Sequence, residues 1–142
     1  MAWTPKKTVV VPVDLSDECL VAVDTALDLV AERTGMHIIH VLPELSPIEP
    51  TVAWEAMQSS LRHRHAEEEL RKWLSDPKYR DLQINVFIGE PAHEVTQFAE
   101  RIKAELIVMP SHGRTGIKRF LIGSIAERTV RLAHCPVLVL RR

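Results

Sequence analysis

The segment "ELIVMPSHGRTGIKRFLIGSIAER", residues 105–128, runs from an apolar stretch through a glycine-containing loop into a helix start. "ELIVM" has the length and composition of a buried strand. Ser124 and Glu127 have the S-x-x-E spacing of a capping box, which predicts Ser124 as the N-cap of a helix over about 124–134. The glycines between them are typical of a turn or of a close backbone approach. The segment therefore predicts strand, loop and helix in that order.

The rest of the chain repeats this alternation. Short apolar runs predict four further strands at about 7–13, 36–42, 82–88 and 136–140. Helices are expected between them: one capped by Ser16 and stopped near Gly35, a long polar one over about 52–75, and one that begins at Pro91. The apolar faces expected on the first and third helices are Leu20, Val23, Leu27 and Val30, and Val95, Phe98, Ala99 and Ile102. Strand 82–88 alternates apolar and polar residues, which indicates a position near a sheet edge.

Strands that alternate with helices predict right-handed crossovers and a parallel sheet covered by helices on both faces. We therefore expect one domain over residues 1–142, an α/β fold with a doubly wound five-stranded parallel sheet. Such sheets bind ligands beyond the carboxyl ends of the strands, where the winding reverses. The two loops best equipped for a ligand are 14–16, after the first strand, and the glycine loop after the fourth.

Composition and charge exclude several classes of function. The chain has 142 residues, 46% hydrophobic and 26% charged, with a net charge of −1. This balance argues against general binding to nucleic acid or to anionic membranes, which needs a basic surface. The apolar run 8–13 is too short for a signal peptide, and no run approaches the length of a membrane span. We expect a cytoplasmic protein in which Cys19 and Cys135 are reduced, buried thiols.

The glycine loop has two interpretations. If a helix starts at Ser124, its amides and the positive end of its dipole offer a site for an anion. Gly113 and Gly116 would permit a tight turn that exposes amides, and Gly123 would let a ligand approach the backbone. Alternatively, the glycines only turn the chain. Neither the Walker motif GxxxxGK[ST] nor the dinucleotide motif GxGxxG is present.

The polar residues near these loops do not form a recognisable catalytic set. Asp14 could accept hydrogen bonds from a ribose, hold a cation, or bond only to nearby turn amides. His112 is a candidate ligand contact, but no nucleophile is evident beside it. His63 and His65 point to different helix faces, and ion pairs with Glu residues four positions on are simpler than a metal site. The sequence thus predicts no catalytic residues and no metal site.

Several motifs resemble the universal stress protein family over essentially the whole chain. They are "VPVDLSDE", "HVL", "GEPAHEV", "SHGRTGIKRFLIGS" and the ending "GSIAERTVRLAHCPVLVLRR". Family members that bind ATP have the pattern G-x-x-G-x(9)-G-[S/T], and Gly113, nine residues and Gly123-Ser124 match its second half. Pro110 stands at the position of the first glycine, and a proline has no amide to donate.

The resemblance implies the strand order 3-2-1-4-5 and an adenine nucleotide as ligand, ATP or AMP, with or without Mg²⁺. Carried onto this chain, it implies contacts to base and ribose from Pro12, Val13, Asp14, Val41, Met109 and Pro110, and to phosphates from Gly113, Gly123, Ser124 and Ile125. It also implies a cytoplasmic role in stress resistance and a homodimer. The apolar strand 136–140, last in the sheet, predicts the same dimer, because an exposed apolar edge needs a cover.

Three functions follow from these observations. The first is a dimeric stress or signalling protein that binds a nucleotide without catalysis. The second is a dimeric interaction module of the same fold that binds no nucleotide, to which Pro110 points. The third is a slow ATPase or a nucleotide-using transferase, against which the lack of an evident base or metal cluster argues.

Overall fold

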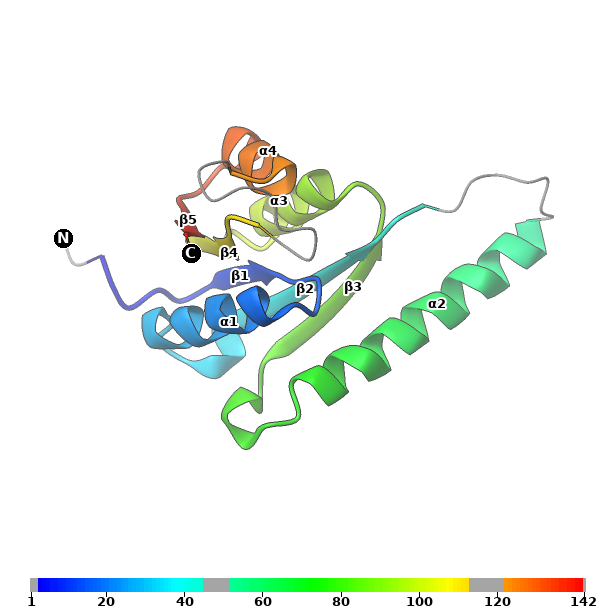
Figure 1. The fold of residues 1–142 in the computed structure, drawn as a ribbon, viewed down its shortest axis with the longest axis horizontal. Helices are drawn as coiled ribbons and strands as arrows, with labels where there is room; N and C mark the ends of the chain where they lie inside the picture. The colour runs from blue at the N-terminus through cyan, green and yellow to red at the C-terminus, as the bar shows by residue number, and fades with distance from the viewer. Residues whose placement is uncertain (1–2, 45–51, 113–121, 142) are drawn as a thin grey trace.

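The computed structural model describes residues 3–44, 52–112 and 122–141 and contains a five-stranded parallel sheet. The strand order is β3-β2-β1-β4-β5, which confirms the expected doubly wound topology (Figure 1). The strands are β1 Val9–Pro12, β2 Met36–Leu42, β3 Gln83–Ile88, β4 Leu106–Pro110 and β5 Val137–Leu140. β3 and β5 are the two edges of the sheet, as the alternating pattern of the former and the terminal position of the latter predicted.

Helices cover both faces of this sheet (Figure 1). They are α1 Asp17–Leu29, α2 Val52–Trp73, α3 Pro91–Arg101 and α4 Ser124–Leu132, with short 3-10 turns η1 Arg33–Gly35 and η2 Pro77–Tyr79. α1 and α2 lie on one face, and α3 lies on the other with α4 packed beside it and against β5. In the described part of the chain, no helix combines the length and apolar character needed to cross a membrane.

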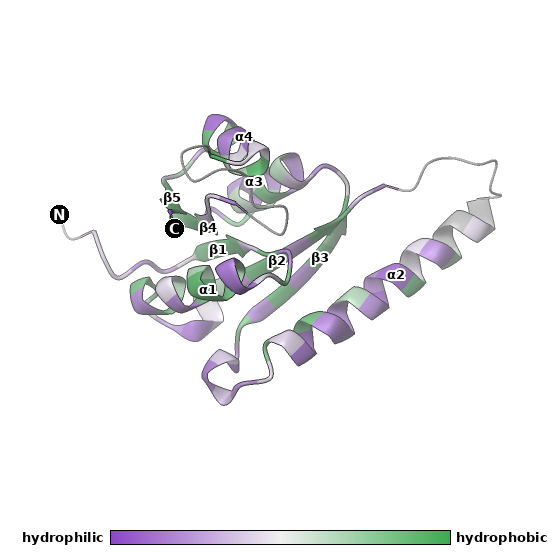
Figure 2. Cartoon of the chain, viewed as in Figure 1, coloured by the Kyte–Doolittle hydropathy of each residue, from purple (hydrophilic) through white to green (hydrophobic). Residues whose placement is uncertain are grey.

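Two hydrophobic cores lie on opposite faces of the sheet. The larger joins α1 and the C-terminal half of α2 to one side of the sheet through residues such as Val11, Val23 and Leu70. The smaller joins α3 to the other side through Val10, Ile39, Val95, Phe98 and Ile107. The central strands consequently carry apolar side chains on both faces, and Figure 2 shows β1 as strongly hydrophobic. This double burial explains why their sequences read as unbroken apolar runs.

The expected apolar residues of α1 do face the larger core, but small side chains form most of its fully buried face. Its buried residues are Cys19, Ala22, Val23 and Ala26, whereas Leu20 and Leu27 are only partly buried at the margin of the core. Small side chains line this face and let α1 approach β1 and β4 closely. The helix also ends at Leu29, before the expected stop at Gly35. Gly35 serves another purpose, because a Cβ there would overlap the carbonyl oxygen of Lys7.

The start of α4 corrects a second expectation. The N-cap is Gly123, and Ser124 is the first helical residue, so Ser124 does not cap the helix. Among the described residues no side-chain hydrogen bond caps this helix, so the capping box expected from Ser124 and Glu127 does not form. The S-x-x-E spacing located the helix start to within one residue but assigned the wrong residue to the cap.

Candidate functional site

A cavity opens where β1 and β4 part. The register between them runs only over Val9–Leu106 and Val10–Ile107, whereas β1 stays paired with β2 as far as Pro12 and β4 with β5 as far as Pro110. The carboxyl ends of the two central strands therefore diverge, at the point where the winding reverses direction. A cavity of about 220 Å³ lies there. This is the position at which doubly wound sheets bind ligands.

The expected site residues that the structure describes all line this cavity. They are Pro12, Val13, Asp14, Val41, Met109, Pro110, His112, Gly123, Ser124 and Ile125. Gly113, like Gly116 and the basic residues Arg114, Lys118 and Arg119, lies outside the described residues. The fold thus brings together residues that are more than 100 positions apart in the chain.

Asp14 follows the carboxyl end of β1 and lies in a tight turn. Leu15 adopts a positive φ of 67°, which folds the chain back so that Ser16 can start α1. The Asp14 carboxylate oxygen Oδ1 accepts a hydrogen bond from the Ser16 amide (3.0 Å) and another from the Cys19 thiol (3.1 Å). Burial raises the pKa of the Cys19 thiol from 9.0 to about 11, so it remains a protonated donor at neutral pH. The turn interpretation of Asp14 is confirmed, and Asp14 is also one of the residues that line the cavity.

Two bonds tie the ends of β1 and β2 together. The Val13 amide donates to the Ile39 carbonyl (2.8 Å), and Nδ1 of His40 lies 2.8 Å from the Val13 carbonyl. A carbonyl only accepts, so Nδ1 of His40 carries a proton in this contact. The backbone polar groups of Val13 are thereby satisfied, which leaves the wall of the cavity formed by Pro12, Val13 and Val41 predominantly apolar.

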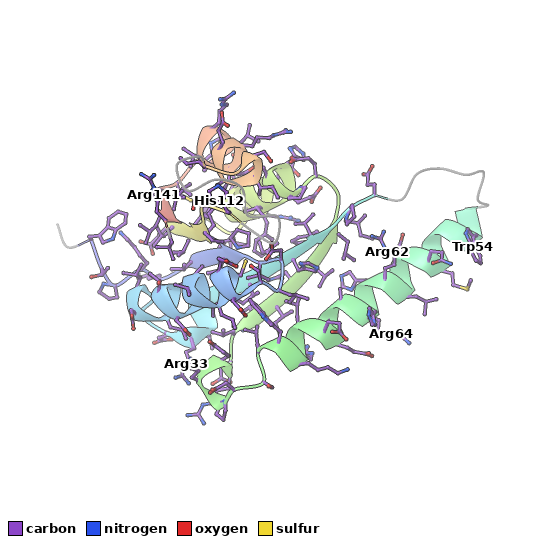
Figure 3. All side chains as sticks on the ribbon, viewed as in Figure 1. Arg33, Trp54, Arg62, Arg64, His112 and Arg141 are labelled. Atoms are coloured by element: carbon purple, nitrogen blue, oxygen red, sulfur yellow. The ribbon has the colours of Figure 1, made fainter. Side chains whose placement is uncertain are left out.

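His112 lies just after β4, on the side of the molecule that carries α3 and α4 (Figure 3). It is 8% exposed, and its Nδ1 is 3.2 Å from Oγ of Ser111. Its second ring nitrogen, Nε2, is buried and has no hydrogen-bond partner among the residues that the structure describes. Buried polar atoms are nearly always paired, which makes Nε2 of His112 a candidate contact for a polar group in the cavity.

The N-terminus of α4 forms the opposite wall. The Gly123 amide donates to the Ser111 carbonyl (2.7 Å), which joins the end of β4 to the start of the helix. The amides of Ser124, Ile125 and Ala126 have no acceptor within the helix, because the first turn of any helix leaves its donors unpaired. These donors and the helix dipole favour a negative group at the cavity.

Seven further residues line the cavity that sequence reasoning did not assign to it: Cys19, Ile39, His40, Pro91, Val95, Ser111 and Ala126. Most are apolar side chains whose sequence signal is that of a core strand or helix. Val95, for example, was assigned to a helix stripe, and it belongs to the smaller core as well as to the cavity wall. His40 and Ser111 could have been found from their positions next to the expected contacts Val41 and His112.

Two of the other histidines make local contacts. Nδ1 of His63 lies 3.4 Å from a carboxylate oxygen of Glu67, four residues on. His37 packs edge-on against Phe98 on the α3 side of the sheet, away from the His40–Val13 contact. Within the described ranges there is no group of three or more His, Cys, Asp or Glu side chains arranged to hold a metal ion.

Comparison with known proteins places this geometry in context. A family model described as the Universal stress protein family matches residues 6–141. Universal stress protein MJ0531 of Methanocaldococcus jannaschii is 37% identical, and the alignment covers 96% of this chain and 82% of that protein.

Solved structures share the fold. The structure of hypothetical protein MJ0577, from the same archaeon, superimposes with a TM-score of 0.79 at 22% identity and covers 98% of each chain. A universal stress protein solved in complex with cAMP superimposes with a TM-score of 0.62 at 23% identity, covering 97% of this chain and 99% of that one.

Proposed function

This chain belongs to the universal stress protein family, and we propose that it binds an adenine nucleotide, ATP or AMP, without catalysis. The observation that carries the proposal is the cavity between β1 and β4, in which an apolar wall, an acidic side chain and a helix N-terminus face one space. These three environments match the base, the sugar and the phosphate of a nucleotide. The fold neighbour solved with cAMP adds support, since cAMP is also an adenine nucleotide.

The residues present fit such a ligand. Val41 and Met109 offer apolar surface for the adenine, and Asp14 offers a carboxylate for the ribose hydroxyls. The amides at the start of α4 suit the phosphates, and Gly123 leaves their approach open. The orphaned Nε2 of His112 would gain a partner. Mg²⁺, if present, would arrive with the phosphates, because the described residues supply no metal cluster of their own.

We propose binding without catalysis because the best candidate pair of nucleophile and base at the cavity, Ser111 and His112, is incomplete. Ser111 and His112 contact one another through Oγ and Nδ1, at 3.2 Å. A working base also needs a group that orients its second nitrogen, and the described residues provide none for Nε2 of His112. The contact satisfies Ser111 and fixes the ring without assembling a triad.

A second candidate is a dimeric interaction module that leaves the cavity empty. Pro110 is the observation that favours it, because this buried residue lines the cavity and offers no amide to a ligand. The missing donor accounts for about 0.5–1.5 kcal/mol, or a two- to tenfold loss of affinity, if that amide would have bonded the ligand. A loss of this size weakens a nucleotide site without abolishing it. We retain nucleotide binding as the proposed function, in a cytoplasmic homodimer.

Native mass spectrometry of the purified protein, followed by calorimetric titration with ATP and with AMP, tests the proposal. We expect a co-purified adenine nucleotide or a saturable heat of binding. A nucleotide-free mass together with no heat and no thermal shift at millimolar ATP would support the interaction module instead. ADP that accumulates from added ATP faster than about one per second would identify an enzyme.

Substituting Pro110 separates the effect of the missing amide from that of local space. Pro110→Gly and Pro110→Ala both restore an N–H at this position, and we expect each to tighten binding of ATP up to tenfold. Glycine also removes the side chain from the cavity, so alanine is the matched control. A gain confined to the glycine variant would assign the effect to space, and no gain in either would mean that this amide does not face the ligand.

A further inference from the structure

The N-terminal half of α2 extends beyond the sheet (Figure 1). The helix has 22 residues, and among those that the structure describes the first to join a hydrophobic core is Ala66. The described side chains of α2 before Ala66 are all half-buried or exposed. Packing against the sheet therefore accounts for the second half of this helix and not for the first.

Two contacts near the middle of α2 fix its orientation about its own axis. Nη2 of Arg62 donates to the Pro43 carbonyl at 2.8 Å, and Nε2 of His63 lies 2.9 Å from the Val86 carbonyl. Arg64 follows Arg62 by two positions, which is about 200° around a helix, and Figure 3 shows the two side chains on opposite sides of α2. The side of α2 near Arg64 thus faces away from the sheet.

Three large apolar side chains lie along the exposed part of this helix. Trp54, Met57 and Leu61 are 51%, 49% and 51% exposed, and their i, i+3, i+7 spacing places them on one side of α2. We call these three residues the α2 stripe. Apolar residues with this spacing are the usual anchors between two helices, and an exposed apolar patch marks an interaction surface.

Basic residues continue the same side of the helix. Arg64 and His65 follow Leu61 by three and four positions, and both are exposed. None of the described acidic side chains forms an ion pair with either of them. A partner that covers the α2 stripe would gain from a carboxylate at this position.

The size of the α2 stripe favours a small partner. A standard stable interface buries roughly 800 Å² on each partner, more than three half-exposed side chains supply, whereas transient signalling contacts are smaller. The α2 stripe is thus too small to hold two copies of this chain together by itself. A single amphipathic helix laid along α2 matches both its length and its straight line of anchors.

We propose that the α2 stripe, with Arg64 and His65 beside it, docks an amphipathic helix of a partner protein that carries apolar anchors and an acidic flank. This interaction is a function beyond nucleotide binding and does not depend on it. The apolar side chains supply most of the affinity, and the basic residues select the charge of the partner.

Two synthetic peptides test the proposal on the full-length chain. Each has about 18 residues, long enough to form a helix, and carries leucines at i, i+3 and i+7. The residues that flank the leucines are Glu in one peptide and Lys in the other. By fluorescence anisotropy, we expect the acidic peptide to bind with a dissociation constant on the order of 10–100 µM and the basic one at least about fivefold more weakly.

Variants of exposed residues assign this binding to α2. Leu61→Ala should weaken binding of the acidic peptide about five- to tenfold. Leu132→Ala is the matched control, because Leu132 is also exposed but lies on α4. Arg64→Glu should abolish the preference for the acidic peptide, and Arg80→Glu, an exposed residue beyond the other end of α2, should preserve it. Thermal melting checks that each variant folds.

Several outcomes would overturn the proposal. Wild type that binds neither peptide, or both equally, would do so, as would a folded Leu61→Ala protein with unchanged affinity. Sedimentation should show the same assembly for wild type and Leu61→Ala, since a loss of self-association in the variant would assign the α2 stripe to a second copy. Wild type should not sediment with phosphatidylserine vesicles, and sedimentation that requires Leu61 would assign the α2 stripe to a membrane.

Discussion

Replacing Gly123 with valine is expected to abolish nucleotide binding at the cavity, with an affinity loss of at least about 100-fold, or about 3 kcal/mol. Gly123 lies at the N-cap of α4 with φ of −63°, an angle that any residue can adopt. The requirement for glycine is therefore one of space. A Cβ at this position would lie 2.8 Å from the carbonyl oxygen of Ser111, closer than real Cβ contacts.

The clash falls on a contact that shapes the site. The Gly123 amide donates to the same Ser111 carbonyl at 2.7 Å, so the two backbones cannot separate without breaking this bond. The added Cβ would also lie 3.7 Å from Cδ2 of His112, next to the orphaned Nε2. A branched side chain must push the start of α4 away from β4, and with it the amides that we assign to the phosphates.

Two other variants make this prediction specific. Gly123→Ala adds the same Cβ without the branches, so it should also lose affinity but less than valine, whose two γ-methyl groups need further space. Ser124→Ala is the matched control at the same helix start, since Ser124 does not cap α4 and its loss should change affinity less than threefold if only backbone amides bind phosphate. Calorimetry with ATP measures affinity, and thermal melting checks that each variant folds. If a folded Gly123→Val protein binds ATP with wild-type affinity, the phosphates do not bind at the start of α4.

Much of the fold could be predicted from the sequence because local sequence patterns indicate most of the helices and strands. The expected strand 36–42 matches β2 residue for residue, and Pro91 begins α3 as its missing amide and fixed φ favour. The strand order could not be predicted from local patterns, because periodicity shows that strands alternate with helices but not which strands are neighbours. That order came from the resemblance to the family, and the sheet confirms it.

The failures have local physical causes. The expected apolar stripe of α1 does face the core, but the pattern missed the small residues Ala22 and Ala26, which are fully buried there. Large side chains dominate a hydrophobicity pattern, yet a helix that lies close to a sheet needs small ones. At α4, the S-x-x-E spacing indicated a helix start, but with Gly123 as the N-cap Glu127 is the fourth helical residue and not the third that a capping box needs. In the structure Gly123 is the N-cap, and its amide bonds to the Ser111 carbonyl.

The cavity could be predicted in part for a related reason. The cavity lies at the carboxyl ends of β1 and β4, and the motifs that follow these strands can be recognised in the sequence. Asp14 and Gly123 were identified in this way, and both line the cavity. The Cys19–Asp14 contact was not identified, because it depends on the positive φ of Leu15 and on the depth at which α1 packs. A pattern of single residues does not encode such a turn, and Cys19 reads simply as a small apolar residue.

The other large effect is expected at β5, where we propose that two copies of the chain pair. β5 bonds to β4 on one side and forms the edge of the sheet on the other, and its residues Val137–Leu140 are all half-buried. An apolar edge of this kind promotes uncontrolled association unless it is covered. Pairing with the same strand of a second copy about a two-fold axis covers both edges at once.

Val139→Lys should convert this dimer largely to monomer. A two-fold axis brings both lysines into one interface, and each buried ammonium group would lack a partner, so we expect the dissociation constant to rise at least about 100-fold. Val21→Lys is the matched control, because Val21 is 58% exposed on α1 and takes the same change in charge. Sedimentation velocity over a concentration series should show a dimer for wild type and Val21→Lys and a monomer for Val139→Lys. Val139 does not line the cavity, so AMP binding by that monomer would separate assembly from ligand binding. A monomeric wild type, or a Val139→Lys protein that remains dimeric, would show that two copies of the chain do not pair through β5.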